Sequence, residues 1–586
     1  MERNKHTEMT TKNPYWNTRF LRFMLNLFGR NINKTVFRCI WWIKYNICFC
    51  KAAPFASGLV FSYKLAEKAI VSVFITYFTQ DASESDLRVA IAFVNGQEAL
   101  SALLYIFMIY LSQAFSGHLK RIIFCLIVAY TCGMVILSLL LLDELDRLPF
   151  DPTILSFIGL ILVAVGRAGL MPFVRRFTAE QFEAHETDKQ NIKEERVKAR
   201  EEMWWRFAWV IGSLVSIPLF NSSWDKRLIT AGWVMGITFV LFYLATPLYH
   251  KREAAATTTI AEKPFICIRV VRAALLKRHM EYSSSPAHFF HYNNINDELE
   301  LWPQVKLLRW IDKAAIIEFE SSLGHEEQEK AGRLCSVTMV QETKYILKLI
   351  PMWSTFLVFG LLLSAGNTFS AQQGIQTESP DFLIYLVLLQ SITRETGSTL
   401  SRFLLSNMMR IWAGMLLSIL CSAVLWRVED HRLDISKSEY GFYGSMSIWW
   451  LAPQFLLLGL MDGLAMYGLE DFTIDDDHLS GSMKNFLPAI NTFIVTGIGS
   501  TLNIIFVFCS NNTLFHERLN DSRLDRYYKY LTIYGTPINC VYLLLISIFV
   551  YGLSDAAQIN EESKSKTTGL DAYASQRVTC GDIFCL

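Results

Sequence analysis

The chain has few charged residues, almost no net charge and none of the short motifs that mark common catalytic sites. Charged residues make up 19% of its 586 residues and the formal net charge is +1, which argues against a nucleic-acid binder. No GxSxG, HExxH or P-loop pattern occurs, so the sequence offers no nucleophilic, zinc or nucleotide-phosphate chemistry. We therefore expect neither an enzyme nor a protein with a bound metal or organic cofactor.

Paired cysteines and a leader pattern are also missing. The twelve cysteines are scattered without a CxxC pair, and several lie in apolar runs. We interpret them as small packing residues, not as a disulfide framework or a metal site. No charged–apolar–small cleavage pattern precedes residue 53, so we expect no secretory signal peptide.

Apolar sequence is what the chain has in abundance. Hydrophobic residues make up 52% of it and its mean hydropathy is +0.27, which is typical of a membrane protein. A membrane-spanning helix needs about 20 mostly apolar residues. Such runs fall at residues 54–79, 87–115, 120–142, 153–175, 204–220, 227–248, 344–370, 381–406, 408–427, 447–470, 483–509 and 527–553. The sequence therefore predicts an all-α membrane protein with twelve transmembrane helices in two sets of six.

The polar segments divide the chain into five parts. They are a basic N-terminal arm (1–52), a six-helix half (53–249), a central linker (250–343), a second six-helix half (344–553) and a C-terminal tail (554–586). Six plus six helices around a long linker predict the major facilitator fold, in which a solute sits near the bilayer midplane between the halves. The arm either lies on an anionic leaflet, because aromatic residues are interleaved with its basic ones, or is a disordered tail.

Charge in the short loops predicts the orientation. The loops 81–86 and 143–146 are acidic, whereas 118–121 and 175–206 are rich in basic residues. The basic side is cytoplasmic in membrane proteins. We therefore expect the arm, the linker and the tail inside, and the glycosylation sequons at Asn221 and Asn511 on the opposite side.

One stretch, Ile161 to Glu183, is central to the functional prediction. Gly166 and Gly169 are small residues at i and i+3, which let another helix come close. Arg167 lies inside the same apolar run, where a charge costs about 2.5–3.5 kcal/mol on insertion scales. Three interpretations stay open for it: a packing helix whose arginine snorkels, an ion pair with a buried acid such as Glu98, or a cation that faces a polar cavity.

Several segments of the chain resemble the plant nitrate/peptide transporter family, the proton-dependent oligopeptide transporter branch of the major facilitators. The segments that carry the resemblance are KAAPF (51–55), FTAEQF (177–182), ATPLY (245–249), LRWIDKA (308–314), CSVT (335–338), NTF (367–369), QQG (372–374), WLAPQ (450–454), GSMK (481–484) and RLDRYY (523–528). The resemblance implies a symporter that couples solute uptake to proton entry, with nitrate, small peptides or organic anions as substrates. It also implies a plant protein of the plasma or vacuolar membrane.

The proton-coupling residues implied by the resemblance are mostly replaced. The family's first helix carries an ExxER motif, and a gap-free match puts Val60, Tyr63 and Lys64 on it. Glu67 lies one turn further along and is a displaced substitute for the missing acids. The lysine of the family's fourth helix is Met171 here, and Arg167 precedes it by one turn on the same helix face.

The second half keeps some of the family's acids. Asp462 holds the position of a tenth-helix glutamate, and Trp353 is a candidate for the aromatic wall of the cavity, although such aromatics also serve as packing residues. Arg394 and Glu395 lie mid-span without a counterpart in the family pattern. Neighbouring residues point about 100° apart on a helix, so we expect each to meet a different partner.

The sequence leaves several functions open. Lys64 and Arg167 form a cation pair that favours an anionic solute or needs a carboxylate between them, for which Glu98 is the candidate. The candidate proton acceptors are Glu67, Glu98, Glu395 and Asp462. The alternatives are a proton-coupled transporter, an uncoupled anion facilitator or exchanger, and a sensor or scaffold that no longer moves solute. The partners we expect are a small solute and the lipid bilayer, with no nucleic acid and an oligomeric state left open.

Overall fold

A computed structural model describes most of the chain as helices. The residues it describes are 53–80, 87–115, 118–141, 152–187, 204–205, 208, 211–212, 224–249, 266–280, 290, 306–318, 324–379, 382–437, 446–475, 479–510, 513–516 and 519–548. The predictions for the arm, the acidic loops, the two sequons and the tail concern residues outside these ranges.

The first half is built from five described helices and short helical pieces near residues 204–212. Its helices are α3 (Ala53–Gln80), α4 (Leu87–Ala114), α5 (Leu119–Leu141), α6 (Pro152–Thr187) and α8 (Trp224–Leu244), followed by the short η4 (Thr246–Leu248). Each overlaps one predicted apolar run, and α6 continues past the predicted end at 175 to Thr187. Pro172 lies inside α6 without ending it, because neighbouring helices can satisfy the freed backbone groups of a buried helix.

The second half contains longer helices. They are α11 (Val337–Ile375), α12 (Leu383–Leu404), α13 (Asn407–Lys437), η9 (Ile448–Leu451), α14 (Ala452–Ile474), α15 (Gly481–Thr492), η10 (Phe493–Ile498), α16 (Gly499–Cys509), α17 (Leu524–Tyr530), η11 (Leu531–Gly535) and α18 (Thr536–Ile546). The segments α15, η10 and α16 follow one another without a break, as do α17, η11 and α18. Each set corresponds to one predicted span.

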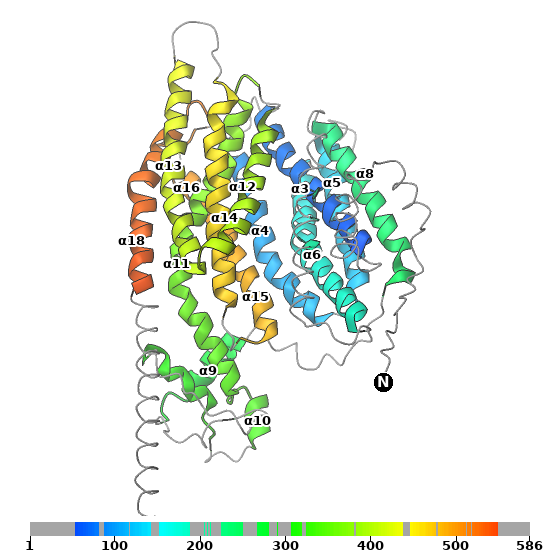
Figure 1. Ribbon diagram of the computed structural model, residues 1–586, viewed down its shortest axis with the longest axis vertical. Coiled ribbons are helices and arrows are strands. Elements are labelled where there is room, and N and C mark those ends of the chain that lie inside the picture. The colour runs from blue at the N-terminus through cyan, green and yellow to red at the C-terminus, as the bar shows by residue number, and fades with distance from the viewer. Residues whose placement is uncertain are drawn as a thin grey trace, which may run out of the picture.

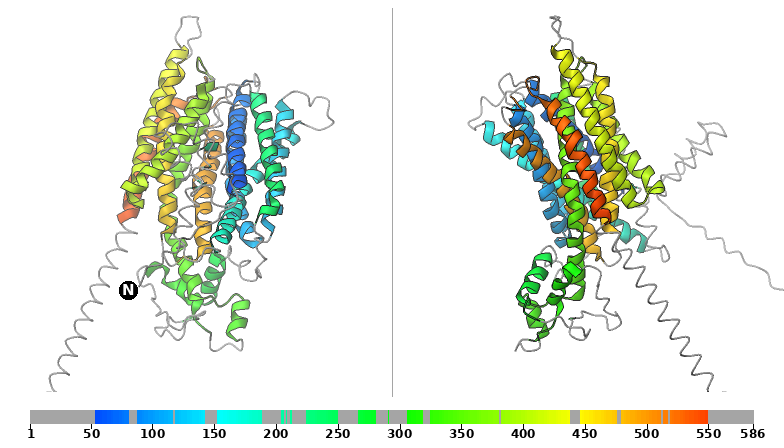
Figure 2. Two further views of the ribbon diagram at one scale, coloured as in Figure 1. Left: turned by 45° about the vertical axis from the view of Figure 1, so that its right-hand side comes forward. Right: turned by 90° about the vertical axis from the view of Figure 1, so that its left-hand side faces the viewer.

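Part of the linker forms a small unit at one end of the helices (Figures 1 and 2). It contains α9 (Ile266–Leu276), η7 (Lys306–Ala315) and α10 (His325–Lys330). The unit is anchored to α11, because Lys344 Nζ lies 2.5 Å from Asp312 Oδ1 and both side chains are 9% exposed. The helix α11 begins at Val337, inside the range expected for the linker, and the Ser336 hydroxyl accepts a hydrogen bond from the backbone N–H of Met339 at its start.

The described helices gather into two groups with separate hydrophobic cores (Figure 1). One core is formed by α3, α5, α6 and α8, and the other by α11, α13, α14 and the helices that follow. The helix α4 contributes to both, since Ile91 and Ile109 belong to the second core and Met108 packs against the first. The two halves therefore meet along α4.

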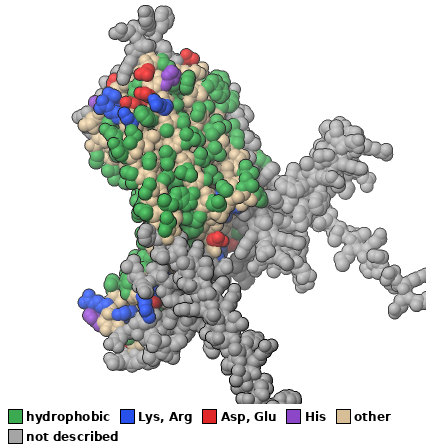
Figure 3. All heavy atoms as spheres, turned by 60° about the vertical axis from the view of Figure 1, so that its left-hand side comes forward, with side chains coloured by type: hydrophobic (Ala, Val, Ile, Leu, Met, Phe, Trp, Pro, Cys, Tyr) green, Lys and Arg blue, Asp and Glu red, His purple; other side chains and the backbone are tan. Residues whose placement is uncertain are grey.

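The outer surface of the second half is mostly apolar between its charged ends (Figure 3). Exposed apolar side chains on this surface include Leu416, Leu420, Ile538 and Val541, which are 52–64% exposed. Among the described residues, seven helices are long and apolar enough to cross a membrane. The chain is an all-α, multi-pass membrane protein whose outer face suits contact with lipid.

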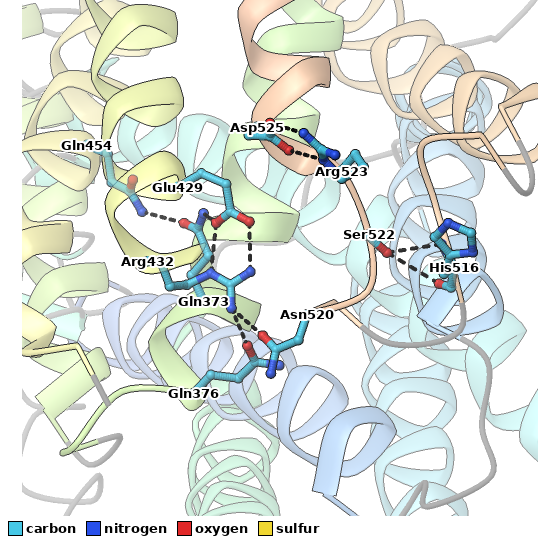
Figure 4. A network of polar contacts seen from close by, with 10 residues as sticks. All are labelled: Gln373, Gln376, Glu429, Arg432, Gln454, His516, Asn520, Ser522, Arg523 and Asp525. Atoms are coloured by element: carbon cyan, nitrogen blue, oxygen red, sulfur yellow. Dashed lines mark hydrogen bonds and ion pairs between the residues drawn. The ribbon is translucent and has the colours of Figure 1, made fainter. Parts of the chain in front are cut away.

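A buried polar network joins α13 to the C-terminal end of α11 (Figure 4). Arg432 donates to both carboxylate oxygens of Glu429, at 2.8 and 2.7 Å, and its Nη1 donates to Gln376 and Asn520. Gln373 donates to Glu429 at 2.6 Å. The ion pair is 6% and 0% exposed, and such a buried pair is stable only when its remaining hydrogen bonds are satisfied, as they are here.

Candidate functional site

Four charged side chains from α3, α4 and α6 come together inside the first half. We call Lys64, Glu67, Glu98 and Arg167 the N-half cluster. Lys64 and Glu67 are three residues apart on α3, so they share a helix face, and Lys64 Nζ forms an ion pair with Glu67 Oε2. Arg167 Nη1 donates to Glu98 Oε1 at 2.7 Å, and Arg167 Nη2 lies 3.5 Å from Glu67 Oε1.

The glycines of α6 explain how Arg167 reaches these acids. A Cβ atom at Gly166 would lie 2.5 Å from Tyr130 Cβ, and one at Gly169 would lie 2.6 Å from Leu126 Cδ2. Both contacts are with α5, so this face of α6 packs against α5 as the small-residue spacing predicted. Arg167 projects from another face of α6, where α3 and α4 supply Glu67 and Glu98.

The cation pair expected from the sequence is balanced by two carboxylates. Glu98 pairs with Arg167, as one of the interpretations from the sequence had it. Glu67, which the sequence analysis gave only as a displaced acid, lies between Lys64 and Arg167 and shares the neutralisation with Glu98. The side chains of Glu67, Arg167 and Glu98 remain 16%, 20% and 24% exposed. The cluster therefore has no net formal charge and is partly open to solvent.

Two other predicted residues lie near the N-half cluster without joining its ion pairs. The ring of Tyr63 is buried and stacks on Tyr130, with centroids 5.9 Å apart. Lys64 Nζ lies 5.9 Å from the centroid of the Tyr63 ring, a cation–π distance. Met171 is partly buried and packs against the core of the first half.

The second half brings Arg394, Glu395 and Asp462 together through α12 and α14. Arg394 Nε lies 3.1 Å from Asp462 Oδ2, and Arg394 Cζ lies 5.6 Å from the centroid of the Tyr467 ring. Glu395 accepts a hydrogen bond of 2.9 Å from the Tyr467 hydroxyl. Arg394 and Glu395 thus have different partners, as the geometry of neighbouring helix residues predicted.

The contacts of Trp353 are those of a packing residue. It is 7% exposed and donates a 2.9 Å hydrogen bond from Nε1 to Asn491 Oδ1. Asn491 in turn donates to Thr473 at 2.9 Å, which ties α11, α15 and α14 together. A role for Trp353 in a solute site remains a prediction.

A polar contact between the two halves was missed by the sequence analysis. Asn95 of α4 accepts hydrogen bonds from Ser364 at 2.5 Å and Thr368 at 3.3 Å, both in α11, and the hydroxyl oxygens of Ser364 and of Ser500 in α16 lie 3.3 Å apart. All four side chains are at most 8% exposed. We call these four residues the cross-half latch. Each of these residues is a single polar residue in an apolar run. The sequence does not predict their contact, because it depends on which helices meet.

Comparisons with known proteins agree with this arrangement. The family model for the POT family (PTR2) matches residues 120–514. Two Arabidopsis thaliana proteins, NRT1/PTR family 5.6 and 5.7, are 26% and 25% identical to the chain over 548 and 549 residues. These matches cover 84% and 86% of this chain and 90% and 88% of the relatives.

Solved structures of POT transporters share the fold. An autoinhibited POT peptide transporter matches with a TM-score of 0.55 and 15% identity, over 86% of this chain and 96% of that one. The POT transporter PepTSo matches with a TM-score of 0.56 and 14% identity, over 86% of this chain and 98% of that one. Both have the major facilitator type of fold expected from the sequence. The chain therefore belongs to the POT family, a family of transporters and not of enzymes.

Proposed function

We propose that this chain is a secondary active transporter that moves a small solute by alternating access and couples it to proton entry through the N-half cluster. The observation that carries the proposal is the position of Glu67 between Lys64 and Arg167. Glu67 thus places a carboxylate on α3, facing the inside of the first half, although both glutamates of the family's motif are absent. Family membership supports the transport function itself.

A proton on Glu67 would change what the cluster attracts. In the ionised cluster, two positive and two negative side chains cancel. Protonation of Glu67 leaves Lys64 and Arg167 with Glu98 as the single carboxylate, so the cluster gains one positive charge. Charges interact strongly in a partly buried site. An anionic group of the solute is therefore favoured when the proton is bound, which links the two binding events.

The solute class that suits this cycle carries an oxyanion: nitrate, a small peptide or an organic anion. Other POT family transporters have been solved in complex with alafosfalin and with 5-aminolevulinic acid, at TM-scores of 0.52 to this chain. Both comparisons are at 11–12% identity. They support small charged solutes for the family fold, and the proposal for this chain rests on its own cluster.

The test is uptake by the purified full chain in proteoliposomes, with labelled nitrate and labelled alanyl-alanine as probes. An inward proton gradient should drive accumulation of at least one probe above its external concentration. Probe exchange without gradient-driven accumulation would indicate an uncoupled facilitator or exchanger. Absence of both uptake and exchange, with correctly inserted protein, would contradict transport of these probes and favour a sensor or scaffold.

A further inference from the structure

Arg394 is held along one edge of its guanidinium, and its two terminal nitrogens are left available. Nε lies 3.1 Å from Asp462 Oδ2, within ion-pair distance, and the ring of Tyr467 lies beside Cζ. No hydrogen bond from either Nη atom occurs within the described residues, and the side chain is 41% exposed while that of Asp462 is 12% exposed. An arginine anchored in this way presents a fixed fork of N–H donors.

The exposed part of Arg394 faces the interior of the bundle. On α12, the most exposed apolar residues are Ile392, Leu400, Phe403 and Leu404, which are 42%, 63%, 83% and 70% exposed. At 100° per residue these four lie within an arc of about 120°, and Arg394 lies about 140° from the middle of that arc. Because the apolar side suits lipid, the open space beside Arg394 belongs to the inside of the protein.

Close packing of α12 on α14 fixes the position of the arginine. A Cβ atom at Gly463 would lie 2.2 Å from the backbone oxygen of Arg394, and one at Gly459 would lie 2.3 Å from that of Gln390. These glycines are four residues apart, the small-residue spacing that lets two helix backbones touch. Asp462, next to Gly463, is thereby brought to Arg394.

Two amides extend the polar surface one turn from Arg394. Gln390 precedes Arg394 by four residues on α12, so their side chains share a face. Its Nε2 donates a 2.7 Å hydrogen bond to Asn367 Oδ1 of α11. Asn367 is exposed although residues 362–366 and 368–374 around it on α11 are buried. Exposed amides within a membrane helix indicate a polar space.

We propose that Asn367, Gln390 and Arg394 form a solute subsite in which the two Nη groups of Arg394 bind a planar oxyanion, a carboxylate or nitrate. The fork geometry of guanidinium matches two oxygens of such a group. This inference rests on the proposed function, since it assigns part of the solute to the second half. In the ionised N-half cluster both Nη groups of Arg167 already face carboxylates, whereas Arg394 is paired through Nε.

The test compares matched probes in equilibrium binding to the purified full chain in nanodiscs. The probes are nitrate, N-acetyl-alanyl-alanine, which keeps the carboxylate and lacks the ammonium, and alanyl-alanine amide, which keeps the ammonium and lacks the carboxylate. The wild type should bind nitrate or the carboxylate probe better than the amide. Arg394→Gln should weaken oxyanion binding at least tenfold and leave the amide unchanged. Equal affinities of the variant and the wild type for the oxyanions would overturn the subsite, as would a wild-type preference for the amide.

Two control variants distinguish loss of the Arg394 Nη donors from loss of folding. Arg427→Gln removes an exposed arginine on α13 and should leave all affinities unchanged. Arg394→Gln with Asp462→Asn removes the ion pair without leaving a buried carboxylate unpaired; it should fold and still fail to bind the oxyanions. Normal oxyanion binding by this double variant also overturns the proposal. Oxyanion binding without uptake in proteoliposomes would keep the subsite and contradict only the transport function.

Discussion

The side-chain oxygen of Asn95 in α4 accepts a 2.5 Å hydrogen bond from the Ser364 hydroxyl in α11, across the boundary between the two halves. The bond is buried, with Asn95 1% and Ser364 8% exposed. In alternating access the halves separate at one end and approach at the other. A buried contact between them must therefore form and break once in each cycle.

Removing the acceptor of this latch should favour separation of the halves near it. Asn95→Leu leaves the hydroxyls of Ser364 and Thr368 without their shared acceptor, and a buried unsatisfied donor costs about 1–3 kcal/mol. Spin labels at Val89 and Glu378, beside the ends of α4 and α11, should report a larger population at long distance.

Ser112→Ala is the matched control for the latch. Its hydroxyl bonds within α4, to the Ile109 carbonyl at 2.7 Å, and does not cross the boundary. It should leave the distance distribution as in the wild type. An unchanged distribution in Asn95→Leu would show that the hydrogen bonds do not hold the two halves together.

Arg167→Ala should reduce transport of the probe solute at least tenfold while the protein still reaches the membrane. The variant leaves Glu98 without the cation that it contacts at 2.7 Å. Adding Met171→Lys returns a cation to the same helix face one turn away, and part of the transport should return. Uptake and membrane expression are measured together. Normal uptake by the single variant would identify Arg167 as a packing residue. If adding Met171→Lys restores membrane expression but not uptake, the role of Arg167 is structural.

The fold was predictable because span length and family segments are both local features of the chain. Asp312 and Ser336 are examples: both lie in segments that resemble the family, Asp312 pairs with Lys344 of α11, and Ser336 caps the start of that helix. The glycines at 166 and 169 also packed a helix as their spacing indicated. These features need no knowledge of which distant helices meet.

The site was predicted only in part, for a geometric reason. The gap-free match put Tyr63 and Lys64 on the acidic motif and made Glu67 a displaced residue. Four residues on a helix advance one turn and rotate only about 40°, so Glu67 can serve the same face. That Glu67 rather than Glu98 lies between the cations depends on how α3 and α6 approach, which the sequence does not state.

The linker unit should become more stable as pH rises above neutral. Lys277 is 2% exposed and donates to the Ile316 carbonyl at 2.5 Å. Burial lowers the pKa of Lys277 from 10.5 to about 8. The unfolded unit therefore binds more protons between these values, so the destabilisation is complete below about pH 8 and disappears toward pH 10.5.

Backbone hydrogen exchange in α9, corrected for intrinsic rates, measures this effect. Protection in the wild type should rise between pH 7 and pH 9. Lys277→Met removes the titrating group, so its protection should be higher at pH 7 and nearly independent of pH. A wild-type pH dependence that persists in Lys277→Met would assign the effect to another group.

The central claim is tested most directly with the Glu67→Gln variant in proteoliposomes. Two assays are compared: accumulation of the probe driven by a proton gradient, and exchange of labelled for unlabelled probe (counterflow). Glutamine imitates the protonated acid and cannot release a proton. The wild type should concentrate the probe under an inward proton gradient, and Glu67→Asp should retain part of this accumulation. Glu67→Gln should exchange labelled for unlabelled probe but fail to concentrate it. Accumulation by Glu67→Gln equal to that of the wild type would contradict proton coupling through the N-half cluster.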